Sequence, residues 1–347
     1  MTFDREDIKA WGRRFAIGIA GLVTIASIII AVLWNDRPEL TELEWQPYPQ
    51  FESSADSVRA TWLGVSTVLF DDGDTQVLID GFFSRPSVAD ILFAAEVQRS
   101  AAEVNRILDE YRMRRLAAII PVHSHFDHAM DIGAIANRSS ASIIGSESTA
   151  NIARGASVPE DQIVIAEPGS TYEFGKFSVR LIRSRHAPLG WGGSVPFAGS
   201  IEEPLVPPAA VSAWREGQSY SIVIDHPQGT TLVQGSAGFI PGSLDDVVVD
   251  VVMFSTFGLQ NFGREYTEEY WLSLVTSTGA TRVLPLHFED YTRPFGTIEL
   301  SPRVIDNFID AANLLDTIRL IWDNDARLHL PEFGKQIVLY PPPAPDA

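Results

Sequence analysis

A cluster of metal-binding side chains follows an apolar segment in the first half of the chain. The segment LAAIIPV, residues 116–122, is branched and uncharged, which predicts a buried strand. It runs directly into HSHFDH, where four metal-binding residues lie within six positions: His123, His125, Asp127 and His128. Imidazole nitrogens and carboxylates are ligands that suit Zn²⁺ and related divalent ions. The pattern therefore predicts a metal centre at the end of this strand.

The spacing within the cluster suggests two sets of ligands. His123 and His125 are two residues apart, so in an extended loop they project to the same side and can hold one ion together. A helix is expected to begin directly after them. Asp127 and His128 would lie in its first turn and point back into the same cavity, where they could serve a second ion.

A long apolar segment near the N-terminus predicts a membrane anchor. Residues 15–34, FAIGIAGLVTIASIIIAVLW, carry no charge, and as a helix they would span roughly 30 Å, the thickness of a hydrocarbon core. Four basic residues precede it: Arg5, Lys9, Arg13 and Arg14. By the positive-inside rule, residues 1–14 form a cytoplasmic tail, and the rest of the chain is exported to the periplasm or cell exterior. A cleaved signal peptide is the alternative, although its apolar region is usually about 7–15 residues and ends in an A-x-A-like site.

The remaining chain predicts one β-rich domain. Residues 35–59 are polar, acidic and proline-containing, which is typical of a linker that lifts a domain off the membrane. From residue 60 onward, short β-rich runs alternate with turns, and helical spacing occurs at 101–114, 265–278 and 302–317. This order predicts two packed sheets covered by helices in a domain over residues 60–341, followed by a short tail at 342–347.

Composition excludes several functions. The formal net charge of −19 and a pI near 4.7 argue against binding to nucleic acid or to the face of an anionic bilayer. The chain has no cysteine, so disulfides, thiolate ligands and a cysteine nucleophile are absent. We expect neither of two further histidines to bind metal: His226 should face solvent in a turn between two strands, and His329, near the end of the chain, lacks neighbouring ligands. The oligomeric state is not indicated by the sequence.

The motifs resemble those of a known family. HSHFDH fits the H-x-H-x-D-H signature of the metallo-β-lactamase superfamily. TWLGVSTVLF followed by TQVLIDGFFSRPS looks like the opening strands of the branch that contains N-acyl phosphatidylethanolamine phospholipase D and the ascorbate-phosphate lactonases. Two later motifs, SRHAP with His186 and VLPLHFEDY with His287, match in order and spacing, so the similarity covers roughly residues 60–300. The resemblance implies a four-layer αββα sandwich of two mixed sheets flanked by helices.

The same resemblance implies how the ligands are shared. One ion would be held by His123, His125 and His186, and the other by Asp127, His128 and His287. The ions would be one or two Zn²⁺, with Mn²⁺ or Fe²⁺ as alternatives. Each set leaves a position open for water, as a catalytic site requires. Asp80, at the end of an early strand, would accept a hydrogen bond from a ligand histidine and orient it.

The chain departs from the family pattern at one position. The family usually has a G-D-[ST]-G-like turn whose aspartate bridges the two ions, whereas this chain has GSAG, with Ser236 at the bridging position. A neutral hydroxyl is a much weaker ligand than a carboxylate. Three consequences remain open: a mononuclear enzyme, two ions bridged by hydroxide alone, or a pocket without catalysis. Glu289 or Asp290 could supply a substitute carboxylate, although strand alternation points at most one of them inward.

A long loop after His186 is expected to cover the site. Residues 187–218 are rich in glycine, proline and tryptophan and are long for an ordinary connection, which favours a substrate-covering lid. Four aromatic residues would line the substrate pocket: Trp191, Phe197, Trp214 and Tyr291.

These observations predict a membrane-anchored metallo-hydrolase. A metal-bound hydroxide would cleave an ester-type bond, a phosphodiester or a lactone, in a small-molecule or lipid-like substrate, and Asp127 would orient the water and transfer its proton. The alternative, motivated by Ser236, is a non-catalytic relative that binds metal or a ligand at the cell surface.

Overall fold

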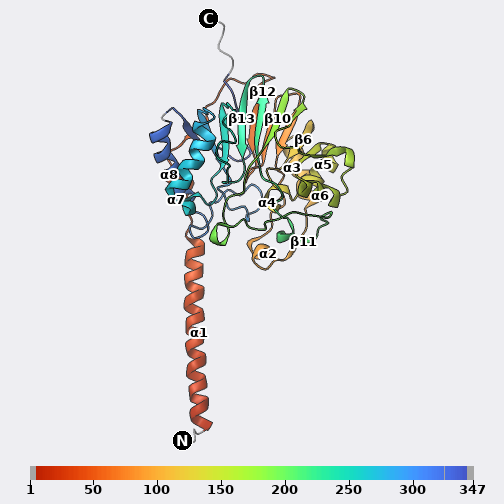
Figure 1. Ribbon diagram of the computed structural model, residues 1–347. Helices are drawn as coiled ribbons and strands as arrows, with labels where there is room; N and C mark the ends of the chain where they lie inside the picture. The colour runs from red at the N-terminus through yellow and green to blue at the C-terminus, as the bar shows by residue number, and fades with distance from the viewer. Residues whose placement is uncertain (1–4, 324, 342–347) are drawn as a thin grey trace.

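A single helix stands apart from the rest of the chain. The computed structural model describes residues 5–323 and 325–341 (Figure 1). The predicted tail at 342–347 and the first four residues of the predicted N-terminal tail lie outside the described residues. Helix α1 (Arg5–Asn35) includes the predicted span and starts within the predicted cytoplasmic tail. Among the described residues it is the one helix long and apolar enough to cross a membrane, over Arg13–Asn35, a test that a signal sequence also passes.

The strands of the described chain form two large mixed sheets and one short pair. In spatial order, the first sheet contains β17 (Gln336–Val338), β2 (Arg59–Trp62), β3 (Val68–Asp71), β4 (Gln76–Ile79), β6 (Leu116–Ile120), β7 (Ser142–Gly145) and β8 (Ile163–Ile165). The second contains β1 (Gln46–Pro47), β16 (Arg327–Leu330), β15 (Arg282–Leu286), β14 (Val251–Ser255), β13 (Gly229–Gln234), β12 (Tyr220–His226), β10 (Phe177–Arg183) and β9 (Thr171–Phe174). The pair is β5 (Glu96–Val97) and β11 (Ala209–Ala210).

Helices cover the outer face of each sheet. Apolar residues of the first sheet pack against α3 (Ala101–Glu110), α5 (Ile132–Ser139) and α6 (Glu147–Gly155), and those of the second pack against α7 (Leu259–Trp271) and α8 (Phe308–Trp322). The two groups lie on opposite sides of the sheets in Figure 1. The predicted αββα sandwich is therefore confirmed. Two short helices, α2 (Val88–Leu92) and α4 (Phe126–Ala129), lie at one end of it.

Strand alternation explains why both faces of the sheets are apolar. In β4, Val77 and Ile79 point into the core between the sheets, whereas Leu78 points outward to the helices. In β6, Ile120 points inward and Ile119 outward in the same way. Because successive side chains of a strand point to opposite faces, a strand buried on both sides is apolar at every position.

The segment predicted to be a linker is part of the domain, and this prediction was wrong. Within residues 35–59, strand β1 pairs in parallel with β16, and Tyr48 is buried in the core between the sheets. Trp45 packs against the same core and donates a hydrogen bond to Asp316 on α8. Most residues of this segment are polar, but a few are large and apolar. Burial of these few stabilises the segment on the domain, although their polar neighbours stay exposed.

Candidate metal centre

The candidate ligands lie at one end of the sandwich because the strands that precede them run in the same direction. β4 is parallel to β6 in the first sheet, and β13, β14 and β15 are parallel in the second. β10 is antiparallel to β12, which is antiparallel to β13, so β10 and β13 also share a direction. A predicted site residue follows closely after β4, β6, β13, β15 and β10: Asp80, His123, Ser236, His287 and His186 respectively. Loops at such strand ends commonly carry functional residues.

Three imidazoles form the first group. The side-chain nitrogens of His123, His125 and His186 lie within 4.8 Å of one another, and His123 Nε2 is 3.0 Å from His125 Nδ1. His186 donates its Nδ1–H to the carbonyl of Ala187 at 2.7 Å, which leaves Nε2 free as a ligand. Burial, followed by the neighbouring imidazoles, lowers the pKa of His186 to about 3. Neutral imidazoles with lone pairs directed at one another fit a shared cation.

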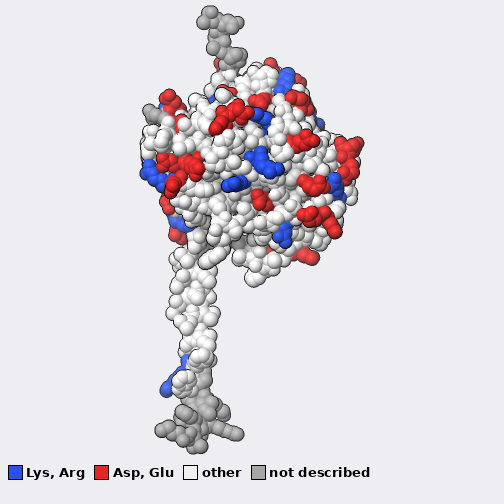
Figure 2. All heavy atoms as spheres, viewed as in Figure 1, with Lys and Arg blue, Asp and Glu red and all other residues white. Residues whose placement is uncertain are grey.

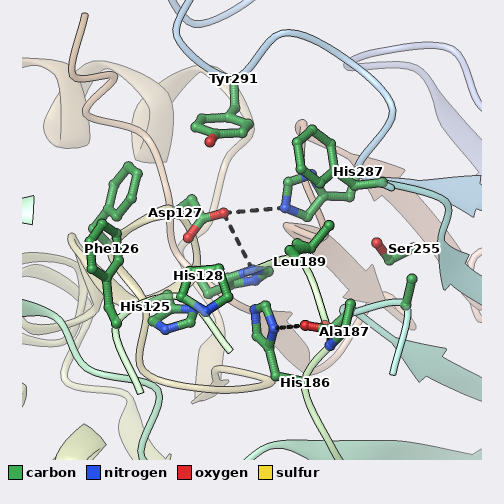
Figure 3. A pocket seen from close by; sticks show the side chains of 16 residues that line it. His125, Phe126, Asp127, His128, His186, Ala187, Leu189, Ser255, His287 and Tyr291 are labelled. Atoms are coloured by element: carbon green, nitrogen blue, oxygen red, sulfur yellow. Dashed lines mark hydrogen bonds and ion pairs between the residues drawn. The ribbon is translucent and has the colours of Figure 1, made fainter. Parts of the chain in front are cut away.

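Asp127, His128 and His287 form the second group. Asp127 Oδ2 lies 3.2 Å from His287 Nε2 and 3.6 Å from His128 Nε2. Dashed lines mark both contacts in Figure 3. Burial disfavours the charged carboxyl, but His128 and His287 outweigh it and lower the pKa of Asp127. The group offers one carboxylate and two imidazoles, a donor set that suits Zn²⁺ and related ions. The rings of His123 and His128 are 4.0 Å apart, so the two groups are adjacent.

Asp80 forms a hydrogen bond with a histidine of the second group and does not itself line the cavity. Its Oδ2 accepts a hydrogen bond from His128 Nδ1 at 2.8 Å and another from the Ser66 hydroxyl at 2.6 Å, while Oδ1 accepts the Val122 N–H at 2.8 Å. With Nδ1 engaged, His128 presents Nε2 to the cavity. This is the contact expected of a carboxylate that orients a ligand histidine. Ser66 is a partner that the sequence analysis missed, since a lone serine in the turn between β2 and β3 carries no pattern.

Two residues of the site have unusual backbone angles. Asp80 has φ of 58° and His287 has φ of 57°, both in the left-handed region that side chains other than glycine rarely adopt. Such conformations cost of order 1–3 kcal/mol each and persist where surrounding contacts hold them. The N–H of His287 donates to the carbonyl of Val65 at 2.9 Å, and the N–H of Asp80 donates to that of Ile120 at 3.1 Å. Bonds between the sheets and their loops therefore hold the strained site in place.

Five of the six candidate ligands, all except His123, line a cavity of about 150 Å³ with mostly apolar walls. The loop after His186 contributes Leu189, Pro196 and Phe197, and the opposite wall contains Phe257 and Tyr291. The loop predicted to be a lid therefore contributes to the cavity wall, and two of the four predicted aromatic residues, Phe197 and Tyr291, line the cavity.

The other two predicted pocket aromatics lie elsewhere, so their assignment is corrected. Trp214 is fully buried in the core between the first sheet and its helices, and Trp191 is 98% exposed. Neither lines the cavity. Composition alone could not distinguish aromatic residues of the loop that face the site from those that pack beneath it or point outward.

No carboxylate replaces the missing bridging residue among the described residues that line the cavity, where Asp127 is the one acid. Ser236 does line it, and its hydroxyl accepts the N–H of Ala187 at 2.9 Å, which fixes the backbone next to His186. Glu289 accepts the N–H of Val65 and pairs with Arg85, and Asp290 pairs with Arg37. Both acids are therefore engaged outside the cavity.

Comparisons with known proteins find similarity to solved structures at low sequence identity. No family model and no curated protein matches the chain. Solved structures do. YhfI from Bacillus subtilis, described as a metallo-β-lactamase fold protein, is 15% identical with a TM-score of 0.48, over 81% of this chain and 99% of that one. Igni18, a metallo hydrolase from Ignicoccus hospitalis, is 13% identical with a TM-score of 0.44, over 81% and 97%.

A third similar structure has a different activity. CmlA, a diiron β-hydroxylase from Streptomyces venezuelae, is 11% identical with a TM-score of 0.49, over 83% of this chain and 55% of that one. Similarity at this level assigns neither an activity nor a substrate. None of these three descriptions names the phospholipase D and lactonase branch, which stays a prediction.

The remaining histidines lie outside both groups. His329 packs against Tyr48 at a ring-centroid distance of 5.4 Å. His226, expected to face solvent in a turn, is instead buried at the end of β12, so that prediction was wrong. Its ring packs against Phe177 at a ring-centroid distance of 5.1 Å and lies 3.5 Å from Asp72. The structure gives neither residue a neighbouring set of ligands.

A buried acid next to the second group was not foreseen. Asp306 accepts the N–H of Gly258 through Oδ1 at 2.9 Å, while its Oδ2 and the side-chain oxygen of Gln260 have no hydrogen-bond partner among the described residues. Burial raises the pKa of Asp306 to about 6. No motif surrounds it, and only the fold brings it close to the loop that carries His287.

The raised pKa of Asp306 predicts a pH-dependent gain from Asp306→Asn. An acid whose pKa is raised on folding weakens the fold as the pH rises from its unfolded value near 4 through its folded value near 6. Asparagine removes this cost and can donate to Gln260, so the free energy of unfolding should rise by roughly 1–3 kcal/mol at pH 7.5. At pH 4 the gain should be nearly absent. Chemical denaturation of both proteins at the two pH values tests this, and equal gains would contradict it.

Proposed function

We propose that this chain is a membrane-anchored, metal-dependent hydrolase that cleaves an ester-type bond, either a phosphodiester or a lactone. The observation that supports it most strongly is the meeting of two ligand groups, one of three imidazoles and one with a carboxylate, at a single apolar-walled cavity. Structural metal sites are closed by their ligands, whereas catalytic sites keep access to a substrate. The proposal places the protein in the metallo-β-lactamase superfamily, with Zn²⁺ as its ion.

The chain's own residues have separate roles in this proposal. A bound ion would supply an acidified water and polarise the bond under attack. Asp127, whose carboxyl pKa is held low by His128 and His287, would be the group that accepts a proton from an attacking water and passes it to the leaving group. Tyr291 lies above Asp127 in Figure 3, and burial, reinforced by Asp127, raises the pKa of its phenol. The phenol therefore stays protonated and can donate a hydrogen bond to a substrate oxygen.

The cavity walls favour a lipid-like ester. Leu189, Phe197 and Phe257 offer apolar surface beside the ligands, whereas no lysine or arginine lines the cavity within the described chain. An apolar chain next to the scissile bond would bury itself against these walls, at a gain of about 25 cal/mol per Å². A highly charged substrate would find no fixed counter-charge apart from the ions.

The anchor is proposed to be α1, with its N-terminus in the cytoplasm and the domain exported. Its apolar side chains are exposed along its length, as Leu22 (69%) and Ile30 (65%) illustrate. Water would exclude such a surface, and a hydrocarbon core would accept it. A cleaved signal peptide passes the same test of length and apolarity and is the competing interpretation of this helix.

A second candidate function is non-catalytic binding of metal or ligand at the cell surface. Ser236 favours it, because a hydroxyl at the bridging position leaves the two groups without an intervening negative charge. A protein that uses its metal only for binding needs no second ion and no attacking water.

Turnover and metal content together test the proposal. The purified full chain, loaded with Zn²⁺ or Mn²⁺, should hydrolyse bis(4-nitrophenyl) phosphate or a member of a lactone panel. His123→Ala/His125→Ala should lose its metal and lower the rate at least about 10²-fold, since no ion then remains to activate water. Equal rates for both proteins would refute the hydrolase. Bound metal in the wild type without turnover on any substrate would support the second candidate.

A further inference from the structure

The end of α1 is bonded directly to the domain. The carbonyl of Asp36, one residue past the helix, accepts the N–H of Arg303 at 2.9 Å, and the Arg303 side chain pairs with Glu42 at 2.9 Å. Arg37 donates to the carboxylate of Asp290 at 2.8 Å and to the carbonyl of Leu300 at 2.6 Å. Because these bonds begin where the apolar helix ends, the domain has no flexible tether.

These bonds place the metal centre close to the end of the helix. Asp290, the partner of Arg37, belongs to the same loop as His287 and Tyr291, which contribute to the ligand group and the cavity wall. If α1 spans a bilayer, Trp34 lies at the surface of that bilayer. The loop that contains Asp290 is bonded to the chain only a few residues beyond Trp34. The edge of the domain that carries the site then faces the membrane.

Several large apolar side chains are exposed on this edge. Val304 (57% exposed) and Ile305 (48%) follow Arg303, and Leu92 (71%) and Phe93 (82%) end α2. Figure 1 shows α2 as the part of the domain that projects furthest toward the side where α1 extends. With Trp191, these residues form what we call the apolar rim.

Trp191 belongs to the rim because of the packing of its loop. Two residues earlier, Leu189 packs directly against Gly258, whose N–H donates to Asp306. Asp306 follows the exposed pair Val304 and Ile305 in the segment that Arg303 fastens to the end of α1. The loop is thus next to that segment, and Trp191, at 98% exposure, has no packing of its own there.

Charge distinguishes this edge from the rest of the surface. Figure 2 shows acidic and basic side chains across the body of the domain, but few on the edge from which α1 leaves. With a net charge of −19, the chain is not drawn to anionic lipid by electrostatics. Tryptophan, phenylalanine and aliphatic side chains instead enter the interfacial region of a bilayer by burying apolar area.

We propose that the apolar rim inserts into the leaflet of the bilayer that α1 spans and holds the metal cavity at the lipid surface. The inference rests on the proposed anchoring by α1 but not on the proposed hydrolysis. Leu189, two residues from Trp191, lines the cavity, so one loop contacts both the lipid and the site. An amphiphilic ester in that leaflet would then reach the ligands without crossing water.

The absence of cysteine allows a direct test with the full chain. Single variants Phe93→Cys and Trp191→Cys are labelled with a polarity-sensitive fluorophore and reconstituted into phosphatidylcholine vesicles that contain spin-labelled lipid. Asp74→Cys is the matched control, because Asp74 is 75% exposed and lies at the opposite end of β4 from Asp80. Leu22→Cys, in the middle of α1, reports on the anchor itself.

The rim labels should shift to the blue and lose about half or more of their emission to the spin-labelled lipid, since inserted side chains lie about 5–10 Å into the interface. The label at position 74 should stay unquenched. Quenching at position 22 without quenching at 93 and 191 would overturn the rim and leave the anchor intact. If the label at position 22 is also unquenched, both the insertion of the rim and the anchoring by α1 are overturned. A blue shift of the rim labels that occurs only at high protein concentration would indicate contact between copies of the chain. That result would also overturn insertion.

Discussion

Asp127→Asn is expected to lower turnover about 10²- to 10⁴-fold, the range typical for loss of a positioned proton acceptor. Asp127 is the one acid among the described residues that line the cavity, and its Oδ2 faces the Nε2 atoms of His128 and His287. Asparagine keeps the shape but has no charge, so it binds a divalent ion weakly and cannot take up a proton. Elemental analysis should show that the ion expected at His123, His125 and His186 is retained, so that the lost rate reports on Asp127 itself.

Asp131→Asn is the matched control for this substitution. Asp131 is also buried and lies four residues further along, but it accepts hydrogen bonds from the N–H groups of Phe83 and Ser84 and from the Ser84 hydroxyl, outside the cavity. Its replacement should leave the rate per folded molecule and the metal content unchanged. If Asp127→Asn retained turnover within about tenfold of wild type, Asp127 would have no catalytic role.

The fold and the ligands after β6 could be predicted from the sequence because each depends on a local pattern. Runs such as QVLI in β4 are apolar at every position, which reflects burial on both faces of a strand. The motif around His123 and His125 follows such a run directly, so its place at a strand end could be predicted. His186 and His287 could not be joined to it by spacing alone. Their assignment depended on the family resemblance, and the structure brings all four rings to one place.

Features that depend on long-range packing were not predictable in the same way. The segment 35–59 appeared polar enough for a linker, but the burial of Tyr48 and the pairing of β1 with β16 attach it to the domain. Trp191 and Trp214 are the same residue type in the same loop, yet Trp191 is exposed and Trp214 is fully buried. No sequence pattern states which of two aromatic residues in an irregular loop turns inward.

A carboxylate at the bridging position should increase the metal content. We expect the wild type to hold about one ion per chain, because two dications about 3.5–4 Å apart repel each other without a negative group between them. Ser236→Asp supplies that group, and elemental analysis of the purified variant should show about two ions. One carboxylate oxygen can still accept the N–H of Ala187, as the serine hydroxyl does, so the backbone beside His186 need not move.

Ser236→Asn separates charge from size in this experiment. Asparagine has nearly the volume of aspartate and can accept the same N–H. As a neutral amide, however, it reduces the repulsion between two adjacent dications only slightly. It should therefore keep the metal content of the wild type. Equal increases in both variants would show that side-chain volume, not charge, limits the second ion. Two ions in the wild type would mean that a bridging solvent species suffices, and Ser236 would then be a structural hydrogen-bond acceptor for Ala187 that leaves the second group competent to bind metal.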